Sequence, residues 1–271
     1  MLESFIFLLT QFLGLLLAWR LLQIEEIKLA LETQQISIVQ FLLAFALGTV
    51  IILVLVKFVK RDRVFQIALQ ASIFLGALLF FDVWLPALAT VLFALAVALL
   101  RQYLPLVITH NLALVIALAG IGAYIGVGFS AWHILIIIAI LAVYDVIAVF
   151  KTKHMVAMFT KLTSKGAAFS IIVPMEIKEM MSRLIKVRLD GPFSFLGTGD
   201  IALPLMFAVS AGKMGWQYSL AIVVGALAGM IAMNIYQIKA EYNKPLPALP
   251  PIGGGAAIGF LLVWVIEQFL I

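Results

Sequence analysis

Residues 131–150 read AWHILIIIAILAVYDVIAVF and decide the fold. A helix needs about 20 mostly apolar residues to cross the hydrocarbon core of a membrane, and this stretch is long enough. Its one carboxylate is Asp145, with apolar sequence on both sides. A charged side chain at that depth costs about 2.5–3.5 kcal/mol, so it is rare and usually functional. The stretch therefore predicts a transmembrane helix and marks Asp145 as a candidate site residue.

Apolar stretches of this kind recur along the whole chain. Of its 271 residues 65% are hydrophobic and only 11% are charged, against about 25% charged in an ordinary soluble domain. The pattern predicts an all-α membrane protein, because only helices and closed barrels span a bilayer and no barrel-type alternation appears. The nine expected spans are residues 5–22, 38–56, 64–85, 87–100, 106–127, 131–150, 193–211, 216–236 and 252–270.

Basic residues predict the orientation of these spans. With nine spans, all 18 Lys and Arg residues except Arg20, Lys28 and Lys213 fall in loops on one side. The positive-inside rule makes that side cytoplasmic, which places the N-terminus in the cytoplasm and the C-terminus outside it. The net charge of +5 is therefore read as a topology signal and as contact with anionic lipids, and no nucleic-acid partner is expected.

One loop is much longer than the others and divides the chain. We expect an N-terminal part of six helices in residues 1–150, a cytoplasmic loop in residues 151–192, and a C-terminal part of three helices in residues 193–271, all within one membrane domain. The loop contains a semi-apolar stretch, residues 167–175, and part of the loop is interpreted as an amphipathic helix on the membrane surface.

Two carboxylates are expected at similar depth on consecutive antiparallel helices. Asp145 lies six residues before Lys151, and Asp200 lies ten residues after Asp190, which places them roughly 9 Å and at most about 15 Å from the cytoplasmic edge. Consecutive helices are usually neighbours, so the two side chains should meet. Two close carboxylates tend to share one proton, and such a pair can activate water while polarising a carbonyl group. This chemistry is that of an aspartic endopeptidase.

The residues around these aspartates fit a substrate site. Gly197 and Gly199 would let a substrate backbone approach Asp200, and Tyr144 is a candidate for shaping the pocket beside Asp145. Residues 245–251, PLPALPP, hold four prolines before the last span. They favour either a proline-rich helix entrance or an extended edge that pairs with an unwound substrate.

The remaining polar residues within or beside the spans are expected to have structural roles. His110, Asn111 and His133 near helix starts are expected to be interfacial or hydrogen-bonded, and Gln70 and Asn234 to bond between helices. The three histidines show no ligand spacing and the chain has no cysteine, so no metal and no cofactor is expected.

Three motifs in this order resemble those of one family: Tyr144-Asp145, Gly197-Thr198-Gly199-Asp200 and Pro247-Ala248-Leu249. Together the chain resembles the presenilin and signal peptide peptidase homologues, intramembrane aspartyl proteases of the GxGD type, and its small size resembles the microbial members. The resemblance implies that Asp145 and Asp200 are the catalytic pair and that the last motif lines the site and helps to position substrate. It also implies a nine-helix presenilin-like bundle.

The expected function is therefore endoproteolysis of transmembrane helices within the bilayer. Expected partners are substrate proteins with transmembrane helices, the lipid bilayer and further copies of the chain. The expected location is a microbial plasma membrane. The alternative from the same residues is a proton-coupled transporter or ion-leak channel, because paired intramembrane carboxylates also relay protons. The absence of a clear inverted repeat favours the protease.

Overall fold

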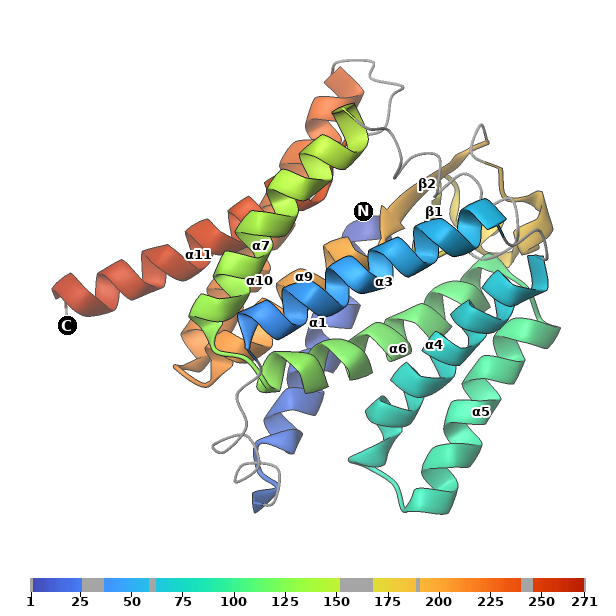
Figure 1. The fold of residues 1–271 in the computed structure, drawn as a ribbon, viewed down its shortest axis with the longest axis horizontal. Coiled ribbons are helices and arrows are strands. Elements are labelled where there is room, and N and C mark those ends of the chain that lie inside the picture. Colours follow the sequence, from blue (N-terminus) through green and yellow to red (C-terminus); the bar gives the residue numbers. More distant parts are fainter. Residues whose placement is uncertain are drawn as a thin grey trace.

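The computed structural model describes residues 2–25, 37–58, 62–151, 168–188, 191–239 and 246–270. These residues form nine α-helices and one two-stranded sheet (Figure 1). The helices are α1 (Leu2–Leu21), α3 (Ile38–Phe58), α4 (Asp62–Asp82), α5 (Ala87–Tyr103), α6 (Val107–Val127), α7 (Ala131–Val146), α9 (Thr198–Gly212), α10 (Trp216–Lys239) and α11 (Leu249–Leu270).

Apolar side chains cover the outside of this bundle. Phe5, Leu88 and Ile238 are 63%, 75% and 78% exposed, which a water-soluble surface of this extent would not tolerate. Six of the nine described helices are long and apolar enough to cross a membrane, and the other three are shorter apolar helices. The expected all-α membrane fold is confirmed, and each of the nine expected spans contains a helix.

Helix α9 lies in the middle of the bundle and packs against α1, α6, α7, α10 and α11 (Figure 1). Its residues from Leu203 to Ala211 are buried without interruption. Pro204 lies inside α9, where its ring removes one backbone N–H from the helical ladder. Gln11 of α1 donates from Nε2 to the carbonyl of Ile201 at 3.1 Å, so α1 supports the first turns of α9 from the side.

The seventh expected span differs at its start. Residues 193–197, expected to be helical, form strand β2 (Phe193–Gly197), and α9 begins only at Thr198. Strand β2 pairs antiparallel with β1 (Ser170–Pro174), with Ser170 opposite Gly197. A paired strand satisfies backbone groups at the membrane edge as a helix does, which allows this exchange.

Strand β1 lies within the long loop. Part of this loop is predicted to be an amphipathic helix on the membrane surface, but residues Ser170–Pro174 of its semi-apolar stretch form a strand whose five residues are all buried. The run Ile171-Ile172-Val173 is β-branched and favours a strand. The sheet lies beside the first turns of α6 (Figure 1), so this part of the loop belongs to the packed domain.

Helices α10 and α11 approach each other closely through glycines. A methyl group added at Gly225 of α10 would overlap the carbonyl oxygen of Gly255 of α11, and one added at Gly259 of α11 would overlap that of Ala221. Small residues at such positions let transmembrane helices pack backbone to backbone. This contact fixes α11, whose first residue, Leu249, lies at the candidate site.

Candidate active site

Asp145 lies near the end of α7 and points into the protein. It is only 5% exposed. Its Oδ2 accepts a hydrogen bond from the backbone N–H of Leu249 at 3.2 Å, whereas its Oδ1 is buried without a partner among the described residues. Directly after Asp145 the helix widens into a π-helical turn, Ile147–Lys151. Such turns are often found at functional sites.

Asp200 is the third residue of α9 and lies just beyond β2. The backbone N–H of Gly197 donates to its carboxylate. A methyl group added at Gly197 would lie 2.7 Å from Oδ2 of Asp200, so only glycine leaves room for this arrangement. An acidic residue in the first helical turn also interacts favourably with the N-terminal end of the helix dipole.

The structure brings the two aspartates into one site. Helices α7, α9 and α11 all pack against one another. The Asp145 and Asp200 carboxylates are close enough for their charges to repel. A third carboxylate, Glu3 of α1, lies within electrostatic reach of Asp200 and accepts a hydrogen bond from Asn234 of α10 at 3.1 Å. No sequence pattern connects Glu3 with Asp200, because the two residues are far apart along the chain.

Gly199, the residue before Asp200, borders open space. A methyl group added at Gly199 would meet no described atom within 4 Å, and Gly199 is exposed. Tyr144, the residue before Asp145, packs edge-to-face on Phe45 of α3, with ring centroids 6.0 Å apart.

The segment Pro247-Ala248-Leu249 also reaches the site. Pro247 and Leu249 are buried, and Ala248 packs against the hydrophobic core. The three residues lead from irregular backbone into a helix. Pro247 and Ala248 are non-helical, and Leu249 begins α11 and turns its N–H toward Asp145.

Two polar residues that were expected to be structural lie close to the antiparallel hairpin formed by β1 and β2. His110 and Asn111, in the first turns of α6, are fully buried and bond to the backbone of β1. Their being hydrogen-bonded was expected, but their partner, the strand paired with the segment leading to Asp200, was not. Two adjacent polar residues in a fully buried helix turn were the available signal, because each must find a partner.

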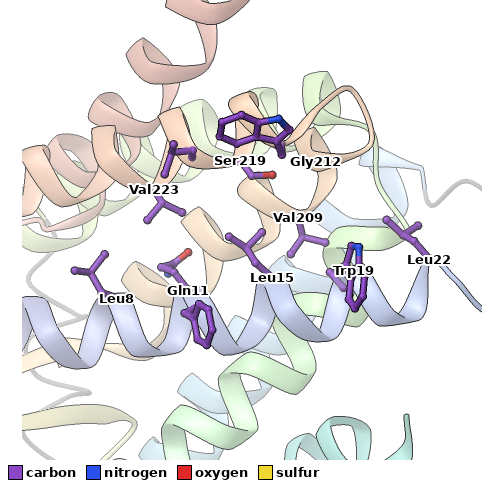
Figure 2. Close-up of a pocket in the computed structure, with 13 residues that line it drawn as sticks. Leu8, Gln11, Leu15, Trp19, Leu22, Val209, Gly212, Ser219 and Val223 are labelled. Carbon is purple, nitrogen blue, oxygen red and sulfur yellow. The ribbon is translucent and has the colours of Figure 1, made fainter. Parts of the chain in front are cut away.

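A separate groove of about 470 Å³ runs between α1, α9 and α10. Figure 2 shows Leu15, Val209 and Val223 along its apolar walls, with Gln11 beside them. Neither Asp145 nor Asp200 lines this groove, whose α9 residues, Val209 and Gly212, lie near the opposite end of that helix from Asp200.

Comparison with protein families matches residues 4–269 to the family described as signal-peptide peptidase, presenilin aspartyl protease. The fold is similar to a structure of a presenilin family intramembrane aspartate protease in the C222 space group, with a TM-score of 0.64 and 22% identity over 96% of this chain and 94% of that chain. A structure of such a protease in the P2 space group gives a TM-score of 0.63 and 20% identity, over 97% and 96%. No curated protein matches the chain.

The fold and the family match together define an intramembrane aspartyl protease. Because the match spans nearly the whole chain, the chain belongs to the signal peptide peptidase and presenilin family.

Proposed function

We propose that this protease cleaves peptide bonds within transmembrane helices of substrate proteins, with Asp145 and Asp200 as its catalytic pair. The observation that carries the proposal is the asymmetric environment of Asp145. Its Oδ2 is held by the Leu249 N–H, and its buried Oδ1 is left for a water molecule. Asp200 stands on the contacting helix α9 and is held in turn by Gly197.

The chemistry follows from two carboxyl groups that share one proton. The ionised carboxylate takes a proton from water while the water oxygen attacks the scissile carbonyl carbon. The protonated carboxyl group donates a hydrogen bond, and then its proton, to the carbonyl oxygen. When the tetrahedral intermediate collapses, a proton passes to the amide nitrogen and the C–N bond breaks. The products are a carboxylic acid and an amine, and the two aspartates again share one proton.

A transmembrane substrate must unwind before it can be cut, because helical hydrogen bonds shield its peptide bonds. We infer that the β1–β2 sheet offers the edge on which the unwound segment pairs, since β2 leads directly to Asp200. The outer edge of β1 is already taken by His110 and Asn111, which leaves the β2 side for an added strand. Gly199 lies between β2 and Asp200, is exposed, and has no described atom within 4 Å of an added methyl group.

The test uses purified protein in liposomes with a single-span peptide, and products are identified by mass spectrometry. Asp145→Asn and Asp200→Asn should each abolish cleavage, because a neutral amide cannot take a proton from water or donate an acidic one. The melting temperature of each variant should stay near that of the unmodified protein. Near-normal turnover in either variant would show that the paired-aspartate mechanism is wrong.

The transporter or channel alternative makes a different forecast for the same preparations. It requires proton flux across the liposomes that depends on both aspartates and no peptide products. Neither the family match nor the solved structures support that alternative.

A further inference from the structure

Asn111 bonds to the backbone of β1 as a neighbouring strand would. Its Nδ2 donates to the carbonyl of Ile172 at 2.7 Å, and its Oδ1 accepts from the N–H of the same residue at 2.9 Å. Asn111 is 2% exposed, and Ile172 is 1% exposed. A side-chain amide carries one donor and one acceptor group, so it can satisfy both backbone groups of one strand residue.

His110 bonds to the same edge of the same strand. Arg101 of α5 donates from Nε to Nδ1 of His110 at 3.1 Å, so this ring nitrogen must be an acceptor. The proton of the neutral ring is then on Nε2, which lies 3.0 Å from the carbonyl of Ser170 and donates to it. Arg101 also donates to Oε1 of Gln70 on α4 at 3.1 Å. Hydrogen bonds between side chains of α4, α5 and α6 therefore support this contact.

These contacts occupy the outer edge of β1, which is one edge of the sheet, and leave the inner edge of β1 to pair with β2. Ser170 and Ile172 are two residues apart, so their backbone groups face the same side of β1. The intervening residue, Ile171, faces Leu196 in β2. The outer edge of β1 is thus fixed to α6, and its inner edge is fixed to β2.

We propose that Asn111 and His110 are positioning residues. They hold the β1–β2 hairpin against α6 and thereby fix the position of the Asp200 carboxylate in the bundle. Strand β2 ends at Gly197, three residues before Asp200, so a shift of the hairpin is passed directly to the carboxylate. The contacts join residues about 60 positions apart, which local sequence does not otherwise hold in place. The inference rests on the proposed role of Asp200 and extends it to residues that do not touch substrate.

The first test replaces Asn111 by an apolar residue of similar size. Asn111→Leu should lower kcat by on the order of 100-fold, the loss that a misplacement of about 1 Å can cause, while KM stays within about twofold. Cleavage positions in the peptide should also spread, because the hairpin can then shift along α6. A matched control is Leu118→Ala, two turns further along α6, where a similarly buried side chain has no group that could hydrogen-bond to the sheet. It should lower the melting temperature without spreading the cleavage positions.

The second readout does not depend on activity. In hydrogen exchange followed by mass spectrometry, peptides covering residues 168–174 should exchange faster in Asn111→Leu than in Leu118→Ala. Asn111→Gln keeps the donor and acceptor but adds one methylene group. It should retain the slow exchange better than Asn111→Leu and recover part of kcat, and it decides the question if Asn111→Leu does not fold.

Slow exchange at residues 168–174 together with an unchanged kcat in Asn111→Leu would overturn the inference. So would a loss of kcat that only follows the melting temperature, as in Leu118→Ala. If Asp200→Asn keeps turnover, the proposed function is wrong instead, and the exchange rates alone then decide whether Asn111 anchors the hairpin.

Discussion

Single residues at the site differ in how much room surrounds them. Gly197 lies against the Asp200 carboxylate, so a side chain at position 197 would collide with that carboxylate. Gly199, in contrast, faces open space. The two glycines flank Thr198, and each meets a different steric requirement of the site. Gly197 constrains the position of the Asp200 carboxylate, and Gly199 leaves the space beside its own backbone open.

We therefore expect different kinetic effects from the same substitution at the two glycines. Gly197→Ala should lower kcat by about 10- to 100-fold, because the added methyl group displaces the Asp200 carboxylate. Gly199→Ala should leave kcat nearly unchanged and raise KM by on the order of fivefold, the factor for about 1 kcal/mol of lost binding. Steady-state kinetics on a single-span peptide checks both. Equal effects on kcat from the two variants would contradict this assignment.

Whole elements place the site through contacts on several sides. Helix α9 carries Asp200 at its first turn, α7 carries Asp145 near its last, and α11 supplies the Leu249 N–H. The position of α11 depends on its close glycine contact with α10, in which Gly255 faces Gly225. Gly254, the preceding residue of α11, faces open space.

This pair of neighbours gives a matched test of the helix contact. Gly255→Ala should destabilise the protein by about 1–3 kcal/mol, because its methyl group meets the α10 backbone. Cleavage should fall as well, since α11 holds Leu249 against Asp145. Gly254→Ala should be neutral or stabilise the protein by up to about 1 kcal/mol, because alanine favours a helix. Thermal unfolding and cleavage are measured on the same preparations. Equal losses of stability in both variants would contradict the proposed importance of the α10–α11 contact.

The whole molecule has a direction in the membrane that its basic loops predict. The described part of the long loop lies at the same end of the bundle as the hairpin, and Ile185 in it is 89% exposed. The turn between α9 and α10 lies beyond the other end of α9, and Met214 there is 44% exposed. The prediction that residues 151–192 are cytoplasmic places Ile185 inside and Met214 outside.

Because the chain has no cysteine, single cysteines can report this orientation. In cells, Met214→Cys should react with a membrane-impermeant maleimide added from outside, and Ile185→Cys should react only after the membrane is opened. Cleavage activity of both variants serves as the control for folding. Labelling of Ile185→Cys in intact cells, with Met214→Cys protected, would reverse the predicted orientation.

The sequence by itself determined the membrane class, the nine helical segments and the two aspartates, because each depends on the character of a short stretch of chain. A carboxylate such as Asp145 stands out in an apolar run whatever its tertiary neighbours are. Only the tertiary structure decided how the site is held. The bond from Leu249 to Asp145 spans 104 positions, and that from Asn111 to Ile172 spans 61. No local pattern encodes such pairings. The hairpin that replaced the start of the seventh helix arose for the same reason, since a strand is stable only when its partner lies beside it.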